Sequence, residues 1–252
     1  MATPPPSPSD FLEILRAERR DLLNRLRQTR FSTLKPGYTQ TQVIPFASYS
    51  PWLDDAAFVA VHERIRAATL VDVYRCYELH RIAQQMAGLP GDFVEVGVWR
   101  GGSAALLASA APGKTIHLFD TFVGVAKARP GYDTLYAGGE HADTDRATVE
   151  ALFSAMGLQC QVHVGVFPDD TRDRLPAHVA LAHIDVDTHA SARDSFGALW
   201  PLVAPGGVVI FDDYGFFGCE GVTQAVHEIM AAATDALLVH NLNGHALLFK
   251  RG

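Results

Sequence analysis

From residue 93 onward, short apolar runs alternate with helical segments, and this alternation restricts the fold more than any other feature of the sequence. The runs are typical of strands because they are brief and bounded by glycine or polar residues. They cover residues 93–98, 116–120, 161–166, 179–185 and 207–212. Helices are expected over residues 54–66, 70–87, 103–111, 145–157, 189–203 and 221–233. Strands separated by helices pair in parallel through right-handed crossovers, so we expect an α/β fold with a doubly wound, mostly parallel sheet.

Two more apolar runs, residues 236–240 and 245–250, close the chain on either side of Asn243-Gly244. An Asn-Gly pair between strand-like runs is a strong hairpin signal, because both residues accept a positive φ. We therefore expect a C-terminal β-hairpin whose last strand runs antiparallel to the sheet.

The segment before the sheet is expected to hold helices and a loop. Residues 1–9 are rich in proline, which a helix interior does not tolerate, and this predicts a disordered tail. Residues 10–68 indicate an N-terminal helical cap and loop, with a helix capped by Asp10 that begins at Phe11. The apolar stripe of this helix indicates that it forms an oligomer contact or a lid. The alternative is that it packs against its own domain. Residues 69–252 form the expected catalytic domain.

The bulk composition excludes several classes of protein. A net charge of −7 and a pI near 5.8 argue against a nucleic-acid binder, which needs clustered Lys and Arg. We find no apolar run as long as a membrane span, and the N-terminus does not have the pattern of a signal peptide. Three cysteines without a CxxC pair indicate free thiols in a reducing compartment. We expect a cytoplasmic small-molecule enzyme, with neither nucleic acid nor membrane as partner.

A glycine-rich turn follows the first run and carries Glu95, Gly97, Gly101 and Ser103. Its spacing does not match the GxGxxG fingerprint of dinucleotide-binding proteins. A short glycine turn beside an acid suits a ligand with an amine, a carboxylate and a nucleoside, such as S-adenosyl-L-methionine. Asp120 ends the second run, where a carboxylate can accept both ribose hydroxyls. The alternatives are a tight turn without a ligand and a helix-capping aspartate.

Acidic pairs follow the fourth and fifth runs: Asp185 and Asp187 in one, Asp212 and Asp213 in the other. If these strands are neighbours, the carboxylates converge and raise one another's pKa. A hard divalent cation resolves that conflict, and oxygen ligands favour Mg²⁺, Ca²⁺ or Mn²⁺ over zinc. We therefore predict Asp185, Asp212 and Asp213 as metal ligands; solvated loop aspartates or helix caps are the alternative.

Such a metal has a use in methyl transfer to oxygen. It would bind the acceptor hydroxyl together with a neighbouring hydroxyl, and lower the pKa of the attacking oxygen. A base must still take the proton. Asp187 is the first candidate, because it lies two residues beyond a ligand, and His189 is the second.

Four motifs together resemble the macrocin O-methyltransferase family: EVGVWRGGSA, LFDTFVG, HIDVDTHASARDS and GGVVIFDDYG. The resemblance spans roughly Thr69 to Lys250. It implies a Rossmann-like class I methyltransferase fold that uses S-adenosyl-L-methionine and Mg²⁺ to methylate sugars of natural products. It also implies metal ligation by Asp185, Asp212 and Asp213, with Asp187 as the base.

The resemblance extends to two cofactor contacts and to assembly. It implies that Thr69 touches the methionine carboxylate, that Phe167 lies beside the adenine, and that the protein is a homo-oligomer. The chain departs from the family at residues 188–190, 216–220 and the insertion 121–143. These segments line the expected acceptor side, so the resemblance implies a sugar hydroxyl as the acceptor class but no particular antibiotic. The insertion is long enough for a lid or substrate loop.

Two other functions remain open from the residues alone. A DxD motif also holds the metal of sugar nucleotides in glycosyltransferases, although the glycine turn and Asp120 argue against that function. A non-catalytic cofactor-binding protein of the same fold is the other alternative.

Overall fold

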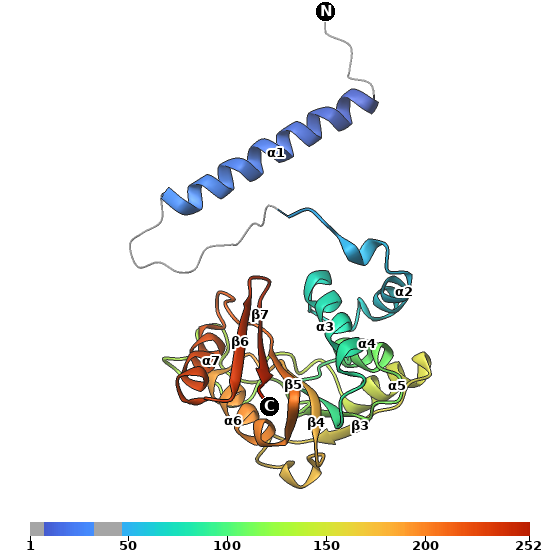
Figure 1. The fold of residues 1–252 in the computed structure, drawn as a ribbon, viewed down its shortest axis with the longest axis vertical. Helices are drawn as coiled ribbons and strands as arrows, with labels where there is room; N and C mark the ends of the chain where they lie inside the picture. Colours follow the sequence, from blue (N-terminus) through green and yellow to red (C-terminus); the bar gives the residue numbers. More distant parts are fainter. Residues whose placement is uncertain (1–7, 33–46) are drawn as a thin grey trace, which may run out of the picture. The chain divides into compact units, whose positions relative to one another are not determined.

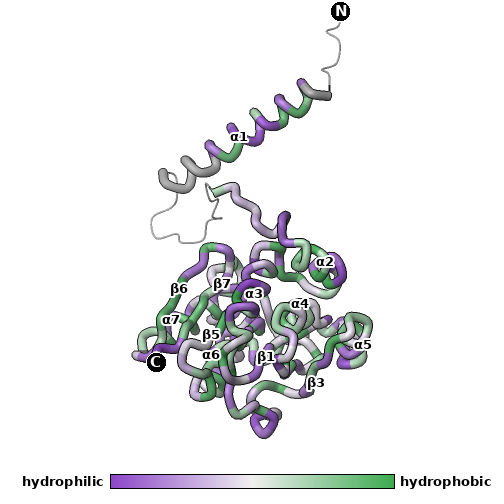
Figure 2. Tube along the Cα trace, turned by 45° about the vertical axis from the view of Figure 1, so that its right-hand side comes forward, coloured by the Kyte–Doolittle hydropathy of each residue, from purple (hydrophilic) through white to green (hydrophobic). Residues whose placement is uncertain are grey.

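A computed structural model describes residues 8–32 and 47–252 of the chain. The chain divides into two compact units, Met1–Tyr49 and Ser50–Gly252. The first unit contains α1 (Pro8–Ser32), which begins before the expected Phe11; proline suits a helix start because its fixed φ is already helical. Polar and apolar residues alternate along the coloured middle part of α1 in Figure 2. Residues 1–7 of the expected disordered tail lie outside the described residues. The domain boundary expected between residues 68 and 69 stays a prediction.

The second unit is built on a seven-stranded sheet with the order β3-β2-β1-β4-β5-β7-β6 (Figure 1). β1 to β5 are parallel, and β7 is antiparallel to both β5 and β6. The doubly wound sheet and the C-terminal hairpin are thereby confirmed. The strands are β1 (Asp92–Val96), β2 (Ile116–Asp120), β3 (Gln161–Val164), β4 (Val179–Ile184), β5 (Val203–Phe211), β6 (Ala236–Asn241) and β7 (His245–Lys250).

Helices cover both faces of the sheet. They are α2 (Ala56–Ile65), α3 (Val73–Met86), α4 (Gly102–Ala110), α5 (Arg146–Met156), α6 (His189–Leu199) and α7 (Glu220–Ala232). Phe93 belongs to a core with residues of α2 to α5, and its neighbour Val94 belongs to a second core with residues of α6 and α7. Successive strand residues point to opposite faces, so both faces of β1 are buried under helices.

Two element bounds differ from the sequence prediction for local reasons. α6 ends at Leu199 rather than residue 203, because Pro201 lacks the N–H that would continue the helix and a 3-10 turn replaces it. β5 begins at Val203 rather than residue 207, because Val203 already pairs with β4 across a register shift. Among residues 8–32 and 47–252, no helix combines the length and apolarity needed to cross a membrane.

The central strands end level with one another. Val96, the last residue of β1, pairs with Phe119 of β2 and Ile184 of β4, and Ile184 pairs with Phe211 of β5. Short backbone bonds continue this alignment into the loops, with Asp212 N donating to Ile184 O at 2.9 Å. The acids that follow β4 and β5 therefore lie side by side at the carboxyl edge, where ligands bind in such sheets.

Candidate functional site

A cavity of about 330 Å³ opens at this carboxyl edge. It brings together most of the side chains predicted from the sequence. Those lining it are Thr69, Gly97, Ser103, Asp120, Phe167, Asp185, Asp187, Asp212 and Asp213. Glu95, Gly101 and His189 were also predicted but do not line it.

The glycine turn allows two chain segments to pass in close contact. Gly97 has a φ of +82°, and a Cβ built on it would lie 1.7 Å from the carbonyl oxygen of Asp185. Gly101 also has a positive φ and caps α4, while Gly102 N donates to Ala68 O at 2.9 Å. The turn therefore requires glycine at position 97, because any side chain there would separate the ends of β1 and β4.

Asp120 organises the same turn. Its Oδ2 accepts hydrogen bonds from the backbone N–H groups of Val98 (2.6 Å) and Trp99 (2.9 Å). Its Oδ1 accepts from the N–H of Phe122 at 2.7 Å. An ionised carboxylate offers about four acceptor positions, so capacity for a hydroxyl donor remains on the cavity side.

Glu95 is fully buried and points away from the cavity. Its Oε1 lies 2.7 Å from Nδ1 of His183, which is its cross-strand partner in β4. Among the described residues, Glu95 Oε2 and His183 Nε2 have no hydrogen-bond partner. Glu95 therefore does not line the cavity, and its expected contact with a ligand amine stays a prediction.

Asp185, Asp187 and Asp213 form a crowded set of carboxylates. Burial and the neighbouring carboxylates Asp212 and Asp213 raise the pKa of Asp185 well above its usual range. Burial, with Asp212 and Asp187 nearby, does the same to the pKa of Asp213. Burial also raises the pKa of Asp187. The site therefore holds more negative charge than its own cations compensate, which is the condition that a bound cation relieves.

The backbone at two of these acids is unusual. Asp187 has a φ of 61° and Asp213 a φ of 59°, in the left-handed region that non-glycine residues seldom adopt. Ligand atoms of Asp187, Asp213 and Cys219 all lie within 4.8 Å of one another. Such conformations persist where surrounding structure enforces them, and they cluster at functional sites.

Asp212 differs from its neighbours because cations surround it. Arg75 of α3 donates to its Oδ1, and His245 Nε2 lies 3.4 Å from the same oxygen. Burial alone would raise the pKa of Asp212, but His245 and Arg75 outweigh burial and hold that pKa below its usual range. Burial lowers the pKa of His245, but the carboxylates of Asp212 and Glu78 outweigh burial and raise that pKa to about 9.

His183, Asp212 and His245 form a second group whose ligand atoms lie within 4.8 Å of one another. This group resembles a transition-metal site in composition. Arg75 already donates to Asp212 Oδ1, so a cation bound among these three side chains would lie close to a guanidinium. The residues fit a cation better on the cavity side, where Asp185 and Asp213 are crowded.

His189 begins α6 and faces away from the crowded acids. Its Nε2 lies 3.0 Å from Glu228 of α7, and its ring stacks on Tyr132 with centroids 4.2 Å apart. The structure thus separates His189 from Asp187, its near neighbour in sequence.

The insertion 121–143 forms a wall of the cavity. Lys127 makes ion pairs with Asp194 (2.8 Å) and Asp169 (3.0 Å), and Ala126 O accepts from Ser191 of α6. These anchors present Tyr136 and His141 to the cavity. Burial and the nearby Asp187 carboxylate raise the pKa of Tyr136, so its hydroxyl stays protonated as a donor.

Five residues of the cavity lining were expected only as parts of a segment. Tyr136 and His141 lie in the insertion 121–143, and Phe216, Phe217 and Cys219 lie in residues 216–220; both segments were expected on the acceptor side. Arg75 was missed, although it had one usable signal: Asp72 lies one helical turn before it and accepts a hydrogen bond from its Nε at 2.9 Å.

Comparison with known proteins adds an independent line of evidence. Residues 59–250 match the model of the macrocin-O-methyltransferase (TylF) family. The chain is 31% identical over 180 residues to the 8-demethyl-8-(2,3-dimethoxy-α-L-rhamnosyl)-tetracenomycin-C 4'-O-methyltransferase of Streptomyces olivaceus, a match covering 64% of this chain and 67% of the relative. It is 30% identical over 181 residues to the mycinamicin III 3''-O-methyltransferase of Micromonospora griseorubida, covering 64% and 70%.

Solved structures agree at the level of the fold. The O-methyltransferase NovP superposes with a TM-score of 0.63 at 24% identity, covering 73% of this chain and 82% of NovP. The calicheamicin methyltransferase CalS11 superposes with a TM-score of 0.58 at 18% identity, covering 84% and 99%.

Proposed function

This chain belongs to the macrocin-O-methyltransferase (TylF) family, and from that premise we propose that it transfers the methyl group of S-adenosyl-L-methionine to a hydroxyl of a sugar or glycoside, assisted by a divalent cation such as Mg²⁺. The observation that carries the proposal is the cavity at the carboxyl edge of the sheet. It joins a glycine turn and Asp120 on one side to four carboxylates on the other.

The glycine-turn side suits the cofactor. Gly97 lines the cavity with its backbone alone, and Ser103 offers a hydroxyl in the first turn of α4. Asp120 retains acceptor capacity for ribose hydroxyls, and Phe167 offers an apolar surface for a purine. Thr69, which precedes α3, is the proposed contact for the methionine carboxylate.

The carboxylate side suits a hard cation. Asp185, Asp212 and Asp213 would hold it, because their oxygens are the ligand type that Mg²⁺ prefers and because two of them are crowded by carboxylates whose charge Arg75 only partly offsets. When bound, the cation supplies positive charge that lowers the pKa of the acceptor hydroxyl.

The chain's own groups perform the remaining steps. The acceptor oxygen forms a bond to the methyl carbon as the bond from that carbon to the sulfonium sulfur breaks, leaving S-adenosylhomocysteine. Asp187 takes the hydroxyl proton on its carboxylate. The anchored wall holds Tyr136 beside that carboxylate and helps to exclude water.

The relatives support the acceptor class. The two similar enzymes are named for methylation of a rhamnosyl-tetracenomycin and of mycinamicin III. Phe216, Phe217 and Tyr136 give the outer cavity aromatic surfaces on which a sugar ring can pack. We infer a small glycosylated acceptor, and we extend the proposal to a homo-oligomer on the strength of the family resemblance.

Calorimetry tests the proposal against the glycosyltransferase alternative. The protein should bind S-adenosylhomocysteine and should not bind UDP-glucose, with Mg²⁺ present in both titrations. Asp120→Asn is the matched variant, because it keeps the shape of the side chain and removes a charged acceptor from the ribose side. Binding of UDP-glucose without binding of S-adenosylhomocysteine would exclude methyl transfer.

A further inference from the structure

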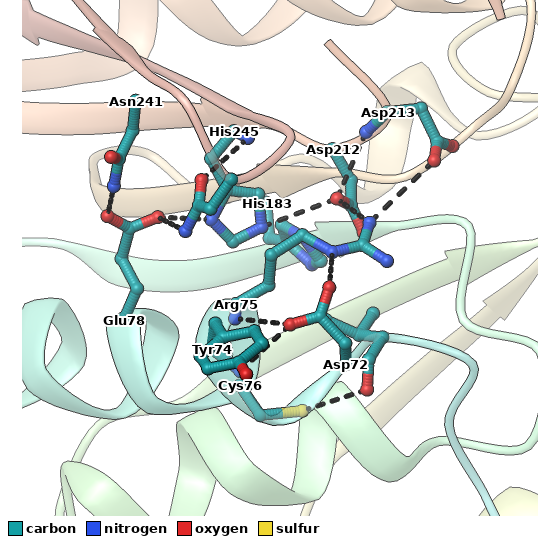
Figure 3. Close-up of polar contacts among 12 residues, drawn as sticks. Asp72, Tyr74, Arg75, Cys76, Glu78, His183, Asp212, Asp213, Asn241 and His245 are labelled. Carbon is teal, nitrogen blue, oxygen red and sulfur yellow. Dashed lines mark hydrogen bonds and ion pairs between the residues drawn. The ribbon is translucent and has the colours of Figure 1, made fainter. Parts of the chain in front are cut away.

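Helix α3 directs two charged side chains at one carboxylate of the proposed metal site. Arg75 contacts Asp212 directly, and Glu78, one turn further along the helix, reaches it through His245 (Figure 3). Residues three apart share a helix face, so one surface of α3 carries both connections. Neither Glu78 nor His245 was predicted as a site residue from the sequence.

His245 lies between two carboxylates. The side chain is fully buried, its Nδ1 contacts Glu78, and its Nε2 lies 3.4 Å from Asp212 Oδ1. The hydrogen bond between Nδ1 and Glu78 sets the orientation of the ring, and Nε2, which has no hydrogen-bond partner among the described residues, faces the charge of Asp212. The first residue of β7 thus connects α3 to the end of β5.

Glu78 is itself held by the C-terminal hairpin. The side-chain amides of Asn241 and Asn243 both donate to its carboxylate, the second at 3.1 Å. Asn243 also accepts a hydrogen bond from the backbone N–H of His245 at 3.1 Å. Glu78, the hairpin turn and His245 therefore form one connected polar unit, and the cost of burying its charged groups is offset by these contacts.

The contacts on Asp212 all use the same oxygen. Arg75, His245 and the backbone N–H of Asp213 (3.0 Å) each approach Oδ1. Oδ1 is therefore occupied by contacts within the protein, and Oδ2 remains available to another ligand. A carboxylate held in this way does not need to reorient when it binds a cation.

We propose that Glu78 and His245 are positioning residues that orient Asp212 for a divalent cation at the proposed site. This inference rests on the proposed function, because it requires a metal at Asp212. Outer partners that orient a ligand typically change metal affinity by about 10–100-fold when they are removed. Glu78 would not touch the metal, because His245 and Asp212 lie between them. His245 belongs to the C-terminal hairpin, which contributes no residue to the cavity lining.

The test measures metal binding apart from catalysis. Binding of Mn²⁺ to the full-length protein is followed by electron paramagnetic resonance, and binding of S-adenosylhomocysteine by calorimetry. Glu78→Gln and His245→Asn should each weaken Mn²⁺ binding by about 10–100-fold, while binding of S-adenosylhomocysteine stays unchanged. The double variant should lose little more than either single variant, because both changes break one connection.

A buried histidine on the same helix provides the control. His80 contacts Asp55 and Gln84 rather than Asp212, so His80→Asn perturbs α3 without touching the network. If His80→Asn weakens Mn²⁺ binding as strongly as His245→Asn, the effect is structural and the positioning role is wrong. Unchanged Mn²⁺ affinity in the isosteric Glu78→Gln variant would also overturn it. Failure of the unmodified protein to bind Mn²⁺ would instead overturn the proposed metal site, and this inference with it.

Discussion

Asp133 Oδ1 accepts a hydrogen bond of 2.9 Å from the backbone N–H of His189, across the boundary between the insertion and α6. Its Oδ2 accepts from the N–H of Arg129 at 2.7 Å within the insertion. Thr188, the residue before α6, makes no capping bond with its side chain. The insertion therefore satisfies a free N–H at the start of this helix and is joined to it.

Replacing Asp133 should reduce stability through this shared carboxylate. Asp133→Ala leaves two N–H groups without their acceptor and should cost about 1–3 kcal/mol in the free energy of unfolding, measured in urea. Asp133→Asn keeps one acceptor oxygen and should cost less. Equal losses in both variants would mean that the negative charge, rather than the two hydrogen bonds, provides the stabilisation.

The close contact at Gly97 gives a second prediction. Gly97→Ala adds a Cβ that would lie 1.7 Å from Asp185 O, at a φ unfavourable to alanine. We expect a loss of about 3–5 kcal/mol in unfolding free energy from backbone strain and overpacking together. Gly113→Ala is the control, since it has a φ of +99° and no atom within 4 Å of its Cβ. Gly113→Ala should cost only about 1–2 kcal/mol, and a similar loss in both variants would show that the contact with Asp185 is unimportant.

The sheet and the acidic side chains at its carboxyl edge were predictable because they depend on local pattern. Apolar runs fix the strands, and parallel strands bring their carboxyl ends to one edge, so Asp120, Asp185 and Asp212 follow from position alone. Glu95 shows the limit of this reasoning. It lies within β1 rather than after it, and its cross-strand neighbour His183 binds its carboxylate away from the cavity.

The remaining misses have a common physical origin in long-range contacts. Arg75 and Asp212 are 137 positions apart, and Glu78 and His245 are 167 apart, so no periodicity within a segment predicts either pair. His189 was the second candidate for the base, after Asp187. The left-handed backbone at Asp187 reverses the chain locally, and His189 then begins a helix that faces Glu228.

Tyr136 should affect turnover without affecting cofactor binding. Its hydroxyl lies beside the Asp187 carboxylate and 3.4 Å from His141 Nε2. Tyr136→Phe removes a hydrogen bond that helps to orient the proposed base, so kcat should fall by roughly tenfold, as expected for the loss of about 1–1.5 kcal/mol. Calorimetry should find unchanged affinity for S-adenosylhomocysteine. Weaker cofactor binding with unchanged kcat would place Tyr136 in the cofactor site instead.

His80 should make stability depend on pH. Burial lowers the pKa of His80 below its usual range, despite the attraction of Asp55 at 3.7 Å. As pH falls through about 6.5, the unfolded chain binds this proton before the folded chain does, so stability is complete above that pH and declines below it. His80→Gln should flatten that part of the stability profile in urea unfolding. If the stability of the variant and of the unmodified protein depends on pH in the same way, His80 is protonated equally in the folded and unfolded states.

Asp213 and Asp187, the two aspartates with a left-handed backbone, should differ in role: we expect Asp213 to be a metal ligand and Asp187 to be the base. Asp213→Asn removes a proposed ligand, so Mn²⁺ binding and methyl transfer should both be lost, and an excess of chelator should reproduce the second effect in the unmodified protein. Asp187→Asn should lower kcat on the order of 10²–10⁴-fold, the usual contribution of a general base, while Mn²⁺ affinity changes less. Both variants keep side-chain volume and should bind S-adenosylhomocysteine normally. If Asp187→Asn loses Mn²⁺ binding as completely as Asp213→Asn, Asp187 belongs among the metal ligands and the proton must go to another acceptor.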